Sequence, residues 1–167
     1  MKFFDALRGG PAQPADSRDM LAHLYGHGRR GGVNTKAAAQ DLGVSERTVR
    51  RWAREGLPAS VAADKLRSEH SRWEDTPAGR ENALGGRLDT FRDSGAAVTM
   101  VGGVIISGDD RGTRQLNMAF DPAEMALLAD VAIHGGGEAD MKAAMEYLVG
   151  QKFGGSVDLN LNQLDFS

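Results

Sequence analysis

The chain has 167 residues, of which 41% are hydrophobic and 26% charged, and its formal net charge is −3. This composition indicates a folded, soluble protein of one domain or two small ones. The absence of cysteine excludes disulfides and thiolate zinc sites, and it fits a reducing cytoplasm. No apolar run approaches the roughly 18 residues that a membrane span needs, so we expect neither membrane insertion nor secretion.

The charge is distributed unevenly along the chain. Residues 1–93 carry 16 Lys and Arg against 13 Asp and Glu, a balance of +3, whereas residues 94–167 carry 4 against 10, a balance of −6. A polyanion is attracted only to the first part. We therefore expect any nucleic acid to bind there.

The first 75 residues have the patterns of helices. A first helix is expected to begin at Asp16 or Ser17, with apolar residues on one face, and to end at the glycines that follow it. Two short helices occupy residues 34–55, and a fourth helix runs from Ser60 until Pro77 closes it. This part of the chain is therefore predicted to be all helical.

The two short helices have the pattern of a helix-turn-helix. Such a motif needs small residues where the helices cross, a glycine at the turn, and apolar residues that join the helices. Gly43 occupies the turn, and Ser45 can cap the second helix. The inward positions are also filled, by Ala38, Ala39, Leu42, Val44, Val49 and Trp52.

The outward face of the second helix predicts DNA binding. We expect Arg47 and Arg50 to contact base edges, through paired hydrogen bonds to guanine O6 and N7. Other basic side chains, Arg29 and Arg30 included, would contact phosphates. The predicted DNA-binding residues are Lys36, Ser45, Glu46, Arg47, Thr48, Arg50, Arg51 and Arg54. The alternative is a solvated, charged face on an ordinary helical hairpin.

The pattern of amino acids changes after the helical part. Residues 76–95 mix Pro, Gly and charge, and they predict a linker, with a short helix over 81–91 as an option. Beyond it, alternating apolar residues predict a β-hairpin whose turn lies at 108–112. Asp121 then begins a helix. A second helix follows over 138–149, and a last strand carries a bulge.

The predicted fold is therefore α+β. An N-terminal all-α helix-turn-helix domain covers residues 1–75, the linker covers 76–95, and a small ββααβ domain covers 96–167. Because three strands leave open edges, we expect a homodimer.

The sequence contains no group of side chains that suffices for catalysis. His23 and His27 are four residues apart, but no third ligand accompanies them, so we expect exposed histidines rather than a metal site. The HGGG segment at 134–137 has no partner nucleophile motif and is expected to be a joint. We therefore expect no enzyme activity, no cofactor and no metal.

Several segments resemble the telomere terminal proteins of actinobacterial linear chromosomes and plasmids. They span most of residues 36–167 in the same order: AAAQDLGVSERTVRRW, ADKLRSEHSRW, RGTRQLNMAFDPAEMALL, MKAAMEYLVGQKF and VDLNLNQLDFS. The resemblance implies a protein that is joined through a hydroxyl to the 5′ end of DNA and primes synthesis there. A telomere-associated protein and a DNA polymerase would be its partners. The position matching the linking threonine is Thr113, with Thr99 and Ser107 as weaker candidates.

A second hypothesis comes from the helix-turn-helix itself. The chain would then be a transcriptional regulator whose acidic second domain dimerises or binds a protein partner. A plasmid partition or transfer factor is a third option. In each case we expect double-stranded DNA as the partner and a nucleoid-associated, cytoplasmic protein.

Overall fold

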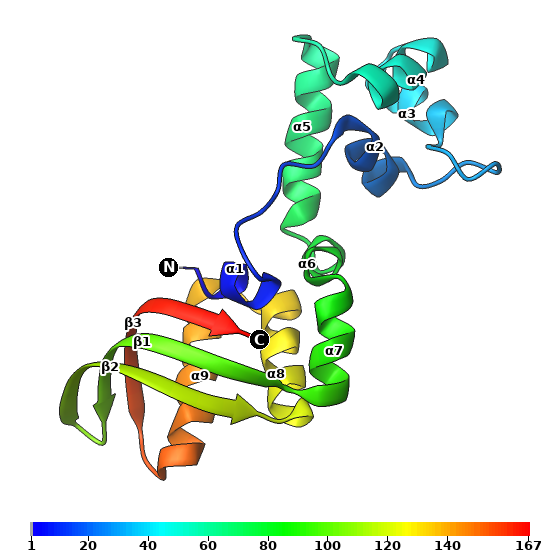
Figure 1. Ribbon diagram of the computed structural model, residues 1–167. Coiled ribbons are helices and arrows are strands. Elements are labelled where there is room, and N and C mark those ends of the chain that lie inside the picture. The colour runs from blue at the N-terminus through cyan, green and yellow to red at the C-terminus, as the bar shows by residue number, and fades with distance from the viewer. Residues whose placement is uncertain (1) are drawn as a thin grey trace. The chain divides into compact units, whose positions relative to one another are not determined.

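The computed structural model describes residues 2–167, which fold into two compact units (Figure 1). The helical unit comprises Gln13–Gly79, and the mixed unit combines the residues up to Ala12 with Arg80–Ser167. The chain therefore passes between the units twice. The helices of the helical unit are α2 (Ser17–Tyr25), α3 (Thr35–Leu42), α4 (Glu46–Glu55) and α5 (Val61–Glu74), and α6 (Pro77–Leu84) leads out of it. The mixed unit contains α1 (Phe3–Arg8), α7 (Gly86–Ser94), β1 (Ala96–Ile106), β2 (Asp109–Phe120), α8 (Pro122–His134), α9 (Glu138–Phe153) and β3 (Val157–Phe166).

The helical unit is built around a small apolar core. The turn between α3 and α4 depends on Gly43, whose φ of 64° and ψ of 31° are left-handed values that a residue with a side chain adopts at a cost. Helices α2 and α5 complete the unit by packing against this pair. The buried residues are Leu21, Ala38, Ala39, Leu42, Val49, Trp52, Ala63 and Leu66. The predicted helix-turn-helix and its inward residues are confirmed.

Local capping fixes where these helices begin. The side chains of Asp16, Ser45 and Ser60 each accept a hydrogen bond from the backbone three residues later, as the sequence predicted. Pro77 differs from the prediction, because it begins α6 instead of closing α5, which ends at Glu74. Proline is favoured in the first turn of a helix, where its missing N–H has no intrahelical partner.

The mixed unit is a two-layer structure. Its antiparallel sheet has the order β2-β1-β3, so β1 is central and the two other strands form the edges. One face of the sheet carries buried residues such as Val98, Met100 and Leu159, and the helices cover this face (Figure 1). The alternate positions of β1 and β3 point to the opposite face, which carries polar and small residues together with the apolar Val101 and Ile105. The predicted α+β fold with its ββααβ order is confirmed.

Irregularities in the sheet lie close to their predicted places. Val101 pairs with Gln163 and Gly102 with Leu161, which leaves Asn162 as the extra residue of a bulge in β3. The hairpin turn, however, consists of Ser107 and Gly108 alone, both with positive φ. The remainder of the segment 108–112, predicted as a turn, belongs to β2.

The segment 76–95, predicted as a linker, is folded. It forms α6 and α7, which are separated at Gly85, where φ is +52°. Leu84, Leu88 and Phe91 are buried in the core of the mixed unit. The linker prediction is therefore wrong, because long-range apolar packing outweighs the weak local pattern.

Helix α1, at the start of the chain, belongs to the mixed unit and not to the helical one. Phe3 and Leu7 of α1 are buried in the core of that unit, and α1 packs on β3 and α9. Arg87 of α7 donates hydrogen bonds to the carbonyl oxygens of Leu7, at 3.1 Å, and Phe166. The helical unit is thus an insertion into the mixed unit. Within residues 2–167, no helix is long and apolar enough to cross a membrane.

Candidate nucleic-acid interface

Helix α4 presents its arginines on the side opposite the core. Val49 and Trp52 face inward, whereas Arg47, Arg50 and Arg54 are exposed. Together with Arg51 they form four like-charge pairs at spacings of three or four residues, each of which costs an isolated helix about 0.2–0.5 kcal/mol. Such a concentration of charge is compensated when an anion binds.

The exposed arginines line an open groove on the helical unit. Its volume is about 930 Å³, and six of its lining residues are arginines: Arg18 of α2, Arg29 and Arg30 of the loop before α3, and Arg47, Arg50 and Arg54 of α4. Its other lining residues are Gly28, Gly32, Val33, Thr35 and Ala53, so no acidic side chain lines it. We call this feature the arginine groove. Its size and charge suit a phosphate backbone.

Glu46 organises the side of the groove near the start of α4. Its carboxylate accepts a hydrogen bond from Arg50 at 2.8 Å and another from the Thr35 hydroxyl at 2.9 Å. The side chain of Arg50 nevertheless remains 63% exposed, and its other N–H groups point to no partner within residues 2–167. Arg47 has no ion-pair partner in this part of the chain. Both arginines are therefore accessible to a ligand.

The remaining predicted residues do not line the groove. Ser45 caps α4 by accepting from the Thr48 amide at 3.1 Å, and the two hydroxyls also lie 2.9 Å apart. Lys36 of α3 and Arg51 of α4 are exposed, but neither lines the groove. These four residues therefore lie outside the lining of the groove, and Ser45 has a structural role as the cap of α4.

Sequence reasoning missed Arg18. It joins the site only because α2 packs across α4, where the Ser17 hydroxyl donates to the carbonyl oxygen of Trp52 at 2.5 Å. Nothing in the spacing of charges along the chain marks this contact. A pattern within one helix cannot report which side chain a neighbouring helix contributes.

The loop that carries Arg29 and Arg30 is a small β-hairpin. His27 and Val33 form a bridge, and the amide of Asn34 donates to the carbonyl oxygen of Gly26 at 3.0 Å. We call residues 26–34 the arginine hairpin. It leads directly into α3, because the side chain of Asn34 caps that helix.

A polar cluster holds α3 in place behind the groove. The hydroxyl of Tyr25 donates to Asp41 at 2.8 Å, and Lys65 donates to the Asp41 carbonyl and carboxylate oxygens at 2.8 and 3.0 Å. The hydrogen bond from Lys65, followed by that from Tyr25, lowers the pKa of Asp41. Burial, followed by the hydrogen bond to Asp41, raises the pKa of Tyr25. The cluster joins α2, α3 and α5.

The sequence predicted that His23 and His27 are both exposed, and the structure shows this for His27 alone, because His23 is half-buried. Instead, Nδ1 of His23 lies 3.0 Å from Nε2 of the buried His70, and His23 stacks on Trp73 with the rings 4.2 Å apart. Among residues 2–167, no group of three or more His, Cys, Asp or Glu side chains is arranged to hold a metal ion.

The three hydroxyls considered for DNA linkage lie on the hairpin of the mixed unit. Thr113, which directly follows the segment 108–112 that was predicted as the turn, lies within β2, where it is exposed and pairs with Gly103. Ser107 occupies the tip instead. Thr99 lies in the central strand and donates to Asn117 at 3.0 Å. The prediction assigned both glycines of 108–112 to the turn. Gly108 does lie in the turn, whereas Gly112 lies at an irregularity in the pairing of β1 with β2, so the tip is nearer the start of the segment than predicted.

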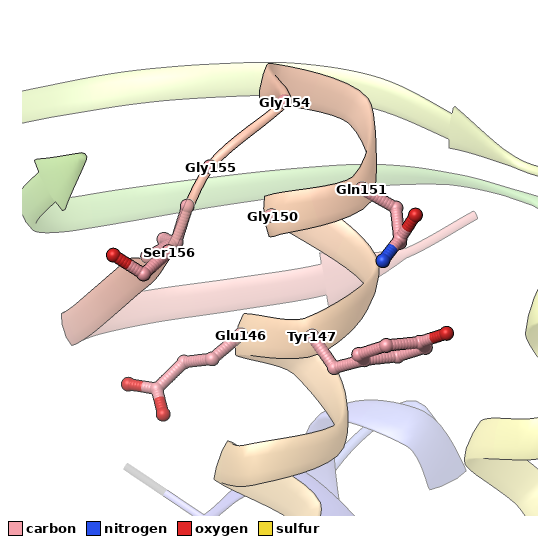
Figure 2. A pocket seen from close by; sticks show the side chains of 8 residues that line it. Glu146, Tyr147, Gly150, Gln151, Gly154, Gly155 and Ser156 are labelled. Carbon is pink, nitrogen blue, oxygen red and sulfur yellow. The ribbon is translucent and has the colours of Figure 1, made fainter. Parts of the chain in front are cut away.

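A second hollow lies where α9 meets the connection to β3 (Figure 2). Its volume is about 410 Å³, and Tyr147 and Gln151 point to one side of the helix while Glu146 points to the other. The Glu146 carboxylate is already bonded to Lys142 and to the Leu159 amide, each at 2.9 Å. Because its carboxylate is already paired, this hollow offers fewer charged groups for binding a ligand than the arginine groove does.

Comparison with known families agrees with the geometry of the helical unit. Residues 26–61 match the family model of a homeodomain-like domain, a span that covers the arginine hairpin, α3 and α4. No curated protein and no solved structure matched the chain. The match concerns the helix-turn-helix alone and does not bear on the resemblance to terminal proteins. The chain thus contains a homeodomain-like helix-turn-helix, the class of domain that binds DNA.

Proposed function

We propose that this chain binds double-stranded DNA at preferred sequences, with α4 in the major groove. The observation that carries the proposal is the arginine groove, in which six arginines from three segments surround one concave surface without an acidic lining residue. The major groove admits an α-helix, and arginine is the side chain best suited to guanine edges. The homeodomain-like match over 26–61 supports the same role.

The test is substitution of Arg47. Selection from a random duplex pool would first supply a preferred site. Arg47→Ala should then weaken binding to that site by about 1–3 kcal/mol, and binding to random duplexes by much less, because a bidentate base contact carries sequence information. Arg72→Ala, which removes an exposed arginine of α5, serves as the control. Equal losses on both duplexes would place Arg47 on phosphates alone, and failure to bind any duplex would refute the proposal.

Within this role we propose a telomere terminal protein as the first specific function. The exposed Thr113 hydroxyl on edge strand β2 supports it, since a protein primer needs a hydroxyl that a polymerase can reach. The hydroxyl oxygen would attack the α-phosphate of a nucleotide, with pyrophosphate leaving, and the polymerase would supply the metal ions and the base. The chain itself would then need no catalytic residues.

The acidic mixed unit favours a second candidate, a transcriptional regulator. Its free edges, β2 and β3, can pair with a second copy or with a partner protein. Incubation with a labelled deoxynucleotide, the polymerase and a telomeric template separates the two functions. Label that survives denaturation in the wild type but not in Thr113→Val indicates priming. Absence of label, together with tight binding to an internal site, indicates regulation.

A further inference from the structure

We propose that the arginine hairpin reads the minor groove of DNA next to the stretch of major groove that α4 enters. This inference rests on the proposed function and adds to it a second contact region with different chemistry. It predicts a preference for A·T pairs on one side of the site bound by α4.

The tip of the arginine hairpin is formed by the two arginines themselves. The amide of Gly31 donates to the carbonyl oxygen of Gly28 at 2.9 Å, which closes a β-turn with Arg29 and Arg30 at its two central positions. Both side chains are exposed, and neither is in an ion pair within residues 2–167. Because the flanking residues are glycines, no other side chain widens the tip. Two guanidinium groups thus stand at the end of a narrow loop.

The arginine groove separates this tip from α4. In duplex DNA a single sugar–phosphate strand separates the major groove from the adjacent minor groove, so a protein that contacts both needs a seat for that strand between its two contact elements. The arginine groove is lined both by hairpin residues and by α4 residues, Arg54 among them, and Arg18 of α2 lines it as well. A phosphate backbone in this position would be surrounded by positive charge.

The base of the hairpin is held firmly relative to α4. The amide of Asn34 bonds to Gly26, and the Thr35 hydroxyl bonds to Glu46 in the first turn of α4. These contacts place the base of the hairpin beside the start of α4, so its arginines lie within reach of the minor groove next to the major groove that the helix would enter. A minor groove that is narrow, as in runs of A·T pairs, has a stronger negative potential that attracts arginine.

Base analogues can test this because they change one groove at a time. The full chain would first be used to select preferred duplexes. A·T pairs flanking the α4 contacts are then replaced by diaminopurine·T, which adds an amino group to the minor groove only. Replacement by inosine·C instead keeps the minor-groove pattern of A·T and changes the major groove. We expect diaminopurine to weaken binding about tenfold and inosine to change it less than twofold.

Two double variants show whether the diaminopurine penalty comes from the arginine hairpin or from other parts of the protein. In Arg29→Ala/Arg30→Ala the diaminopurine penalty should disappear, whereas Arg72→Ala/Arg92→Ala, which removes two exposed arginines elsewhere, should keep it. A penalty that persists in the hairpin variant, or its absence from the wild type, would overturn the inference. Equal losses on selected and random duplexes in the hairpin variant would also overturn it, because they mean phosphate contact alone. If the wild type selects no duplex, the proposed function fails as well.

Discussion

Glu46 is an acidic residue at the edge of a surface that otherwise attracts anions. Its carboxylate holds Arg50 at 2.8 Å and also fixes Thr35 at the base of the arginine hairpin. An acidic group close to DNA repels phosphates, so it lowers general affinity. It can also orient an arginine toward one base edge. We infer that Glu46 improves discrimination between sequences at some cost in affinity.

Glu46→Gln should therefore raise affinity for random duplexes severalfold and reduce the ratio between selected and random DNA. Thermal stability should change by less than about 0.5 kcal/mol, because the ion pair that is lost is exposed. Fluorescence anisotropy at two salt concentrations measures both affinities. Glu81→Gln removes the same charge from an exposed position of α6, which does not line the arginine groove, and should leave the ratio unchanged. An unaltered ratio in Glu46→Gln would contradict the orienting role.

His70 makes the stability of the helical unit depend on pH. Burial lowers the pKa of this imidazole; Glu74 opposes the shift, neighbouring His23 adds to it, and Asp19 opposes it. The unfolded chain, with an ordinary imidazole pKa near 6.5, then takes up a proton at a higher pH than the folded chain does. The contribution of neutral His70 is complete above that value. It is lost as the pH falls toward the lowered pKa of the folded state.

The free energy of unfolding of the helical unit should accordingly decrease between pH 7 and pH 5. His70→Gln keeps a group that can hydrogen-bond to His23 but cannot titrate, so its decrease should be smaller. Urea unfolding followed by Trp fluorescence at each pH measures the difference. His134→Gln, at an exposed histidine of α8, should behave as the wild type does. An equal decrease in His70→Gln would show that other groups cause the dependence.

At the scale of elements, the two adjacent glycines of β1 differ in whether the structure has room for a side chain. A Cβ on Gly102 would collide with the backbone oxygen of Asn160 beside the bulge in β3, whereas one on Gly103 would lie 3.7 Å from the nearest atom, the Asn160 Cβ. Gly102→Ala should destabilise the mixed unit by about 1–3 kcal/mol, since backbone must move. Gly103→Ala should be neutral or stabilise it by about 0.5–1 kcal/mol, as Ala does in a strand. Thermal unfolding of both variants measures this contrast, and similar losses would refute it.

Elements with local signals were predictable from sequence, and those that depend on distant contacts were not. Ser45 and Gly43 mark the ends of α3 and α4 through cap and turn chemistry that acts within a few residues. In contrast, α1 has only one short apolar turn, and Phe3 and Leu7 gain their burial from residues far along the chain. The residues of the arginine groove show the same contrast. The arginines of α4 follow from helical spacing, whereas Arg18 enters the groove through packing between helices.

At the scale of the whole molecule, sequence neighbours belong to different folding units. Leu7 is fully buried in the mixed unit, and Leu21, only fourteen positions later, is fully buried in the helical unit. The contacts of Leu7 are with a unit whose other residues begin at Arg80. A division of the chain by sequence order would instead place both leucines in one N-terminal domain. The two arrangements predict different consequences for the same substitutions.

Leu7→Ala should destabilise the mixed unit by about 2–5 kcal/mol, through lost burial and the cavity that remains, and should leave the helical unit and DNA binding unaffected. Leu21→Ala is the matched control, with the same change of side chain and the opposite expected result. Hydrogen exchange distinguishes them, because amides of β1 should lose protection in Leu7→Ala and amides of α4 in Leu21→Ala. If amides of α4 instead lost protection in Leu7→Ala while amides of β1 kept it, helix α1 would belong with the helix-turn-helix. The insertion of one unit into the other would then be refuted.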